Sequence, residues 1–576
     1  MTEPAAAVPS TPAGPGWFAR AFTFLARHPR LILTVFCLVL WAPGVASLPP
    51  LDRDESRFAQ SSKQMLETGD LVDIRFGAEP RYKKPVGIYW MQAATTTVAG
   101  MGDHSRIWTY RLPSLLGAIA AVWLAFWCAR ALAGAEVAFA AAALLGASVL
   151  LTSEATIATT DAVLLACVLG IQGMLLKVYL AAKGEREPVG TAIVLAGWTA
   201  LGLGILVKGP VVLAVSALTA AGLWIWDKDG RWLRATKPLI GLAVVLAIVA
   251  PWLIAIWLKS HGHFFEQSLG QDFGSKLQGG QESHGAPPGY FLALSGITLW
   301  PAILLVLPGL AAAIRAHKQP AMRFLLVWAA TWVMFELVPT KLPHYVLPTY
   351  PALTIMAAVW AFRAREDGLW WERLLFYVAP ASFAIAAAGL ALAPMLLPSL
   401  YGDGVLWWAA LPSLAFASCA AAALIAYLRQ ARIAAAFFAL VAPIALYPVL
   451  TAGVAPHLTQ LWVSPRAAAA ERALSRPDDP PPSLAGYVEP SLVFLLGTDT
   501  RQTTGPGAAD AGAAQGGLAL VEDREGGAFK ARLAELDADA TEMGAVDGFN
   551  YSRGRKVHIR IYRVAPVREV PPPPPE

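Results

Sequence analysis

Charged residues are scarce in this chain. Only 15% of its 576 residues are Asp, Glu, Lys or Arg, whereas a soluble domain usually has about 25%. Hydrophobic residues make up 56%, so the composition indicates a polytopic membrane protein. The net charge of +5 is small for this length, and the basic residues cluster between apolar runs. That pattern reports orientation in a membrane and argues against a nucleic-acid partner.

Cysteine is also rare, and the four cysteines form no paired motif. No CxxC or Cys/His spacing occurs, so we expect neither a disulfide framework nor a cysteine metal site. Each thiol lies inside an apolar run, where we interpret it as a packing group at lipid depth. The chain also lacks a repeat of 20–50 residues. The cysteines are Cys37, Cys128, Cys167 and Cys419.

Apolar runs of roughly 20 residues recur about thirteen times between residues 31 and 453. Basic residues precede the first run, which places residues 1–30 on the cytoplasmic side. With that start, the predicted inner loops hold most of the loop Lys and Arg. The sequence therefore predicts an α-helical membrane domain, 31–453, with about 13 transmembrane helices. A cleavable signal peptide ending near Gly44–Ser47 is the alternative interpretation of the first run.

Two outer loops are long, 50–108 and 259–288, and an odd number of spans places the C-terminal region on their side. From about residue 454 the composition changes to short strand and helix patterns. These predict a small α/β periplasmic domain over 454–566, followed by a disordered Pro-rich tail, 567–576. We find no catalytic motif in this domain.

The first outer loop begins with a cluster of charge that contains Asp54, Glu55 and Arg57. A carboxylate at the start of a helix is stabilised by the helix dipole and free N–H groups. The cluster is therefore either the cap of an amphipathic helix on the membrane surface or a pair of catalytic acids with their arginine. Composition alone leaves both interpretations open.

Lys83 and Lys84 form a second basic cluster, shortly before Tyr89. Lysines next to interfacial aromatic residues bind anionic head groups non-specifically. The alternative is that a lysine neutralises one phosphate within a site. A third cluster contains Lys341 and Tyr345, and Tyr345 is either an interfacial anchor or an O–H donor to a phosphate oxygen.

The second long loop contains His261, His263, Lys276 and His284. Histidines in loops are more often solvated than metal-bound, and a spacing of two is no metal signature by itself. We therefore keep a divalent metal and no cofactor as open alternatives. All these clusters fall on the outer face. Glu154, Asp161 and Lys208 at outer turns further indicate a water-filled cavity that opens outward.

These motifs resemble the GT-C superfamily of membrane glycosyltransferases. The likeness is to the bacterial branch related to protein mannosyltransferases and to the lipid A aminoarabinose transferase, and it covers most of residues 31–453. The matching motifs are Asp54-Glu55-x-Arg57-Phe58-Ala59, Lys84-Pro85 followed by Tyr89-Trp90, His284 before Pro287 and Tyr290, and Lys341-Leu342 with Tyr345, Leu347, Pro348 and Pro351.

The resemblance implies a polyprenyl-phosphate-linked sugar as donor and an active site at the periplasmic face of the inner membrane. By this resemblance, Asp54 matches the catalytic aspartate and Arg57 the arginine of the same motif. Lys84 matches the lysine that meets the donor phosphate, and Tyr345 a tyrosine near it. The acceptor would be lipid A or another envelope lipid or glycan, and transfer would invert the sugar.

Two departures from the branch concern a metal. Lys83 occupies a position where the aminoarabinose enzymes tend to have a Glu, and Lys276-Leu277 replaces an Arg-Phe pair. The extra positive charge could replace a metal near the leaving phosphate. The competing function is a transporter or flippase for a lipid-linked sugar, whose intramembrane charges would line a path. No symmetry between two halves of this sequence supports that alternative.

Overall fold

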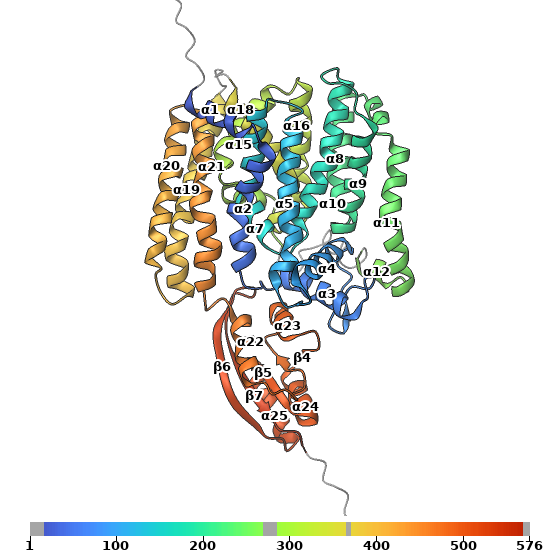
Figure 1. The fold of residues 1–576 in the computed structure, drawn as a ribbon, viewed down its shortest axis with the longest axis vertical. Coiled ribbons are helices and arrows are strands. Elements are labelled where there is room, and N and C mark those ends of the chain that lie inside the picture. The colour runs from blue at the N-terminus through green and yellow to red at the C-terminus, as the bar shows by residue number, and fades with distance from the viewer. Residues whose placement is uncertain (1–15, 269–284, 364–369, 568–576) are drawn as a thin grey trace, which may run out of the picture.

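A helical bundle and a smaller domain below it make up the chain in the computed structural model, which describes residues 16–268, 285–363 and 370–567 (Figure 1). The C-terminal domain lies at the same end of the bundle as helices α3, α4 and α12 (Figure 1). The N-terminal helix α1 lies at the opposite end. The first half of the bundle consists of α1 (Trp17–Leu25), α2 (Pro29–Ser47), α3 (Asp54–Thr68), α4 (Gly87–Gly100), α5 (Ile107–Ala129), α6 (Ala135–Gly146), α7 (Val149–Thr156), α8 (Asp161–Ala182), α9 (Thr191–Lys208), α10 (Val211–Asp227), η1 (Arg231–Thr236), α11 (Pro238–Ser260) and α12 (His263–Phe265), with a short β1–β2 pair (Arg75–Phe76, Glu79–Pro80) between α3 and α4.

The second half of the bundle continues the same pattern of long apolar helices joined by short segments. Its elements are α14 (Tyr290–Thr298), α15 (Ile303–Arg315), α16 (Pro320–Ala330), α17 (Trp332–Leu337), η3 (Pro343–Thr349), α18 (Tyr350–Phe362), α19 (Trp370–Tyr401), η4 (Trp407–Ala409), α20 (Ala410–Leu428), α21 (Arg432–Pro448), η5 (Val449–Val454) and η6 (Ala455–His457).

The expectation of a polytopic helical membrane protein is confirmed. In the described part of the chain, ten helices are long and apolar enough to cross a membrane, or eleven if the bent pair α6–α7 is one span. The two shorter apolar helices, α10 and α15, occupy the remaining predicted runs. The 62° bend between α6 and α7 falls at Ser148, whose side chain accepts a hydrogen bond from Leu151 N and so caps the new helix.

Small residues let the central helices approach closely. A Cβ at Gly117 of α5 would lie 2.8 Å from Val163 Cα of α8, and one at Gly173 would overlap the Trp127 ring. Membrane helices lack a hydrophobic driving force between them, so close van der Waals packing at such positions holds them together. The tight α5–α8 contact fixes the outer ends of these two helices, which carry Arg111 and Asp161.

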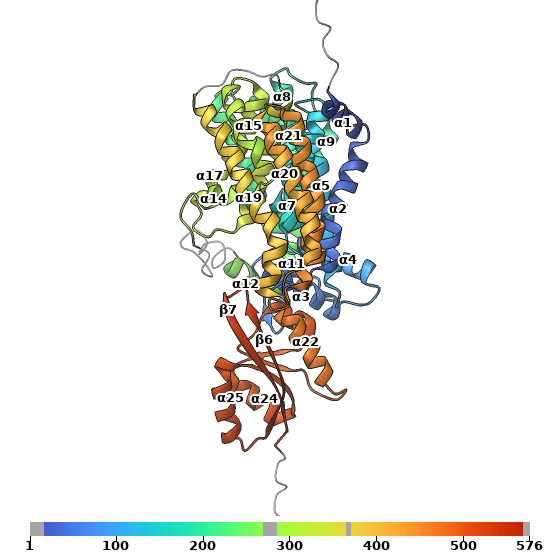
Figure 2. The same ribbon diagram turned by 90° about the vertical axis from the view of Figure 1, so that its left-hand side faces the viewer.

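The C-terminal domain is a five-stranded mixed sheet with helices on both faces (Figure 2). The strand order is β4-β3-β5-β7-β6, with β3 parallel to β4 and β5, and β7 antiparallel to β5 and β6. Alternation along β5 sends Leu518 and Leu520 to one face and Ala519 and Val521 to the other. The elements are α22 (Val463–Leu474), β3 (Ser483–Ala485), α23 (Pro490–Leu496), β4 (Arg501–Thr503), α24 (Gly505–Gln515), β5 (Gly517–Glu522), α25 (Asp523–Glu535), β6 (Ala540–Asn550) and β7 (Arg555–Val564).

The two parts of the molecule meet at α23. Phe494 of α23 is fully buried and packs with Tyr110 of α5, Ala59 of α3 and Ala158. The Phe494 and Tyr110 rings meet edge to face, with centroids 5.6 Å apart. The C-terminal domain is therefore packed directly on the first outer loop.

Candidate active site

A buried ion pair anchors the start of α3. Arg111 Nε and Nη2 donate to the two carboxylate oxygens of Glu55 at 2.7 and 2.9 Å, and both side chains are excluded from solvent. The remaining donors of Arg111 satisfy backbone carbonyls at the end of α2, including that of Leu48 at 2.7 Å. Glu55 also accepts from the backbone N–H groups of Leu51 and Ala158, each at 2.8 Å. Both oxygens of Glu55 thus bind Arg111 and backbone N–H groups outside α3, which is a structural role. It differs from the predicted cap, because α3 has no side-chain cap at its N-terminus.

Asp54, one residue earlier, faces a different environment. Its side chain is 54% exposed, and its Oδ1 lies 3.9 Å from Arg57 Nη1. Desolvation pushes the pKa of Asp54 upward, but the guanidinium groups of Arg81 and Arg57 outweigh it. His344 and Lys84 add to this effect, so the pKa of Asp54 is held below its ordinary value. Asp54 is therefore a carboxylate at neutral pH, within electrostatic range of residues from three segments.

Arg81 was not singled out by the sequence, although it belongs to the same basic stretch as Lys83 and Lys84. It is buried, donates to the hydroxyl of Tyr89, and lies 4.8 Å from the centroid of the Phe58 ring. Burial of Tyr89 is complete, so this tyrosine supports Arg81 rather than facing the open site. The guanidinium of Arg81 is thereby fixed beside Asp54.

The opposite side of the site is built from the outer ends of α7, α8, α9 and η3. Lys208 Nζ donates to Asp161 Oδ1 at 2.5 Å, and His344 Nε2 lies 3.8 Å from Asp161 Oδ2. His344 Nδ1 lies 3.6 Å from Glu154 Oε1, and Thr159 donates to Glu154 at 2.6 Å. Tyr345 follows His344, with its ring centroid 5.5 Å from Lys208 Nζ. Their place at outer turns was the only sign of this cluster in the sequence.

Glu154, Asp161 and His344 are the residues in the described part of the chain that could hold a metal ion together. One ligand atom from each lies within 4.8 Å of the others. Two carboxylate oxygens and one imidazole nitrogen form a donor set that suits a divalent cation. Lys208 already neutralises Asp161 in this arrangement and would compete with such an ion.

None of these three was predicted as a metal ligand, and the predicted ligands that the structure describes, His261 and His263, are not part of the cluster. His261 and His263 are exposed at the end of α11 and the start of α12. His284 and Lys276 lie outside the described residues.

The three predicted substrate-binding lysines that the structure describes differ in exposure. Lys341 is buried, and its ammonium donates to the backbone carbonyls of Glu336 and Val338 at 2.6 and 2.8 Å. Those contacts make Lys341 a residue that fixes the loop before η3. Lys83 is exposed, whereas Lys84 is half-buried on the side of Asp54.

An apolar cavity of about 660 Å³ lies between α4, α5, α8 and α9. Small side chains, among them Gly117, Ala166 and Ala200, form much of its wall. Val163 and Cys167 of α8 also line it, whereas Asp54, Lys84, His344 and Tyr345 do not. Its size and apolar wall suit a hydrocarbon chain.

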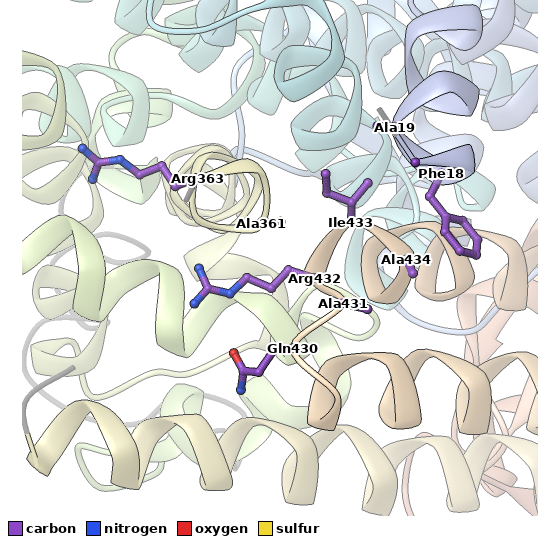
Figure 3. A pocket seen from close by; sticks show the side chains of 10 residues that line it. Phe18, Ala19, Ala361, Arg363, Gln430, Ala431, Arg432, Ile433 and Ala434 are labelled. Carbon is purple, nitrogen blue, oxygen red and sulfur yellow. The ribbon is translucent and has the colours of Figure 1, made fainter. Parts of the chain in front are cut away.

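A further cavity, of about 340 Å³, lies at the other end of the bundle, where α1, α18 and α21 meet (Figure 3). Phe18, Arg363, Gln430 and Arg432 line it (Figure 3). This end carries basic loop residues, in agreement with a cytoplasmic orientation. None of the predicted site residues lines this cavity.

The chain is similar to one family model and to a set of curated transferases, each over part of its length. Residues 83–257 match the family described as dolichyl-phosphate-mannose-protein mannosyltransferase. The undecaprenyl phosphate-alpha-4-amino-4-deoxy-L-arabinose arabinosyl transferase of Edwardsiella ictaluri is 26% identical over 347 residues, which are 60% of this chain and 59% of that protein. The enzyme of the same name from Pseudomonas paraeruginosa is 29% identical over 331 residues, 55% of this chain and 58% of that protein. The chain thus spans less than two thirds of the length of these curated relatives.

The fold is similar to that of a solved membrane protein over nearly its whole length. The crystal structure of ArnT from Cupriavidus metallidurans bound to undecaprenyl phosphate has a TM-score of 0.72 at 20% identity, covering 92% of this chain and 97% of that one. Its apo state has a TM-score of 0.69, with 95% and 98% covered. The chain therefore shares the fold of that protein. Its resemblance to the bacterial branch of aminoarabinose transferases and protein mannosyltransferases is confirmed.

Proposed function

We propose that this protein transfers a glycosyl group from a polyprenyl-phosphate-linked sugar to an acceptor at the periplasmic face of the inner membrane. Lipid A or another envelope glycolipid is the proposed acceptor, and transfer inverts the sugar. The observation that carries the proposal is the electrostatic interaction of Asp54 with Lys84 and His344, which come from three outer segments. An apolar cavity among the membrane helices is a second, separate observation that suits a lipid-linked donor. The names of the curated relatives and the undecaprenyl phosphate bound to the similar structure support the donor class.

The basic residues around Asp54 stabilise the leaving phosphate. Cleavage of the bond between the sugar C1 and the phosphate oxygen leaves negative charge on the phosphate. Lys84 and Arg57 supply positive charge, and the Tyr345 hydroxyl can donate a hydrogen bond. In this proposal the apolar cavity between α4, α5, α8 and α9 holds isoprene units of the donor.

Asp54 acts on the acceptor. Because its pKa is held below the ordinary value, it is ionised and can accept the proton of an attacking hydroxyl. If the acceptor is a phosphate group, it is already anionic, and Asp54 then orients it or stabilises positive charge developing at C1. Both roles need the carboxylate at the same place beside the sugar.

A divalent cation is a separate part of the proposal. Glu154, Asp161 and His344 would hold it, and when bound it would supply further positive charge to the site. The transfer derived above uses the chain's own cations and does not pass through that ion.

Substitution of Asp54 tests the function. The full-length protein, reconstituted with an undecaprenyl-phosphate-linked aminoarabinose and lipid A, should produce lipid A of higher mass, measured by mass spectrometry. Asp54→Asn should lower the rate about 10²–10⁴-fold, the usual range for loss of a general base. Glu79→Gln is the matched control, because Glu79 is an exposed carboxylate in the same outer loop. Near-normal transfer by Asp54→Asn, or translocation of the donor without any transfer, would reject the proposal.

A further inference from the structure

The backbone directly before Asp54 is bent in an unusual way. Arg53 has φ 63° and ψ −115°, the geometry of the first central residue in a type II′ turn. That position favours glycine, and a residue with a side chain keeps it only where its surroundings impose it. Because Asp54 is the next residue and the first of α3, this bend decides where the Asp54 carboxylate points.

The turn between β6 and β7 contacts the bend. The hydroxyl of Tyr551 accepts a hydrogen bond from Asp52 N at 2.7 Å. The backbone carbonyl of Ser552 accepts from Arg53 Nη2 at 2.5 Å. The Tyr551 ring is itself held by Trp462, with ring centroids 6.1 Å apart. The tip of this hairpin therefore binds the two residues that precede Asp54.

A second contact comes from α23. Ser491 is fully buried and donates to the carboxylate of Asp52. Its oxygen lies 2.6 Å from that of Ser464 in α22, which in turn lies 3.0 Å from the Tyr487 hydroxyl. The side chain of Asp52 thus enters a polar cluster that belongs to the C-terminal domain.

The membrane domain holds the bend from the other side. Leu51 N donates to Glu55, which is fixed by Arg111, and Ser56 Oγ donates to the Leu51 carbonyl. The bend therefore has hydrogen-bond partners in both parts of the molecule. Contacts further along α3, such as Gln60 Nε2 to Thr498 Oγ1 at 2.7 Å, join the same two parts without touching the bend.

We propose that Tyr551, Ser552 and Ser491 are positioning residues for Asp54, so that the C-terminal domain completes the active site. The effect on catalysis rests on the proposed function. The effect on the backbone at residues 51–54 does not, because it follows from the contacts alone.

Tyr551→Phe tests this role by removing one oxygen and keeping the ring. Hydrogen–deuterium exchange of the full-length protein should show faster exchange of the Asp52 amide, since its acceptor is lost. In the transfer assay kcat should fall about tenfold, which matches the loss of one net hydrogen bond. The KM for the polyprenyl donor should stay within about twofold, because the phosphate contacts are untouched. Thr498→Ala is the matched control, since it breaks a contact between the same two parts away from the bend.

Hydrogen exchange at Asp52 tests the positioning role, and the transfer assay tests the proposed function as well. Equal exchange and equal kcat in Tyr551→Phe and Thr498→Ala would overturn the positioning role. A raised KM with unchanged kcat would overturn it too. If Tyr551→Phe does not fold, Ser491→Ala replaces it, with the same expectation at Asp52. If the wild-type protein transfers no sugar, the proposed function fails, and exchange at Asp52 still decides whether the C-terminal domain holds the bend.

Discussion

Ion pairs at the outer end of the membrane domain and on the surface of the C-terminal domain differ in their exposure to water. At the outer end, the side chains of Arg111 and Glu55 are 0% and 1% exposed. On the C-terminal domain, those of Arg532 and Asp510 are 37% and 50% exposed. Water screens the exposed pair, whereas the buried pair must be satisfied by its own partners. Because burial of a charge costs free energy, the buried Arg111–Glu55 pair indicates that the start of α3 is held in a defined position.

Loss of one partner of the buried pair should have the largest effect. Arg111→Met leaves the Glu55 carboxylate buried without its cation, which typically costs roughly 3–5 kcal/mol of folding stability. We expect little folded protein, measured by size-exclusion chromatography and thermal unfolding in detergent. The double variant Arg111→Met with Glu55→Gln should recover part of the stability, because no unpaired charge remains. A stable single variant would show that the pair does not anchor α3.

Removal of Lys84 should leave the fold intact and reduce activity. Loss of a preorganised cation near the leaving phosphate corresponds to roughly 2.7–4 kcal/mol, so Lys84→Ala should lower kcat about 10²–10³-fold. Steady-state transfer from the polyprenyl donor measures this. Lys83→Ala is the comparison, since Lys83 is the exposed neighbour and should cost much less. Equal losses in the two variants would place the phosphate elsewhere.

Asp52 should make the contact between the two parts depend on pH. Burial raises the pKa of Asp52 to about 7, although hydrogen bonds from Ser491 and Tyr551 oppose the shift. Glu489 also raises this pKa, and Arg53 lowers it. The folded protein then holds one more proton than the unfolded chain between about pH 4 and 7.

Stability from this group is therefore greatest below about pH 4 and is lost as the pH rises through 7. Hydrogen exchange at residues 51–54 should accelerate from pH 5 to 8, after correction for intrinsic exchange. Asp52→Asn should remove this dependence. An unchanged profile in Asp52→Asn would assign the pH effect to another group.

The exposed pair should give the smallest effect. Arg532→Gln should leave the melting temperature and the transfer rate unchanged, because the guanidinium is well solvated. Thermal unfolding of the purified protein measures this. A clear loss of stability would mean that the C-terminal surface is not a simple solvated face.

Much of the site could be predicted from the sequence. Asp54 and Lys84 lie in the first outer loop and Tyr345 lies in a later one, and loops on one side of a membrane can lie close together. The structural roles of Glu55 and Lys341 could not be predicted, because the sequence does not show whether an ionisable loop residue binds substrate or another part of the protein. The role of Arg111 could not be predicted either, since its carboxylate partner Glu55 is far away in the sequence.

The sequence by itself determined the membrane class, the number of apolar runs and the side on which the charged loops lie. These follow from composition and run length, which depend on transfer of residues from water to lipid. The tertiary structure decided which of two neighbouring carboxylates faces the open site. Successive helix positions point about 100° apart, and the packing of α3 against α4, the start of α5 and the C-terminal domain sets its rotation. That rotation turns Glu55 toward Arg111 and leaves Asp54 beside Arg57 and Lys84.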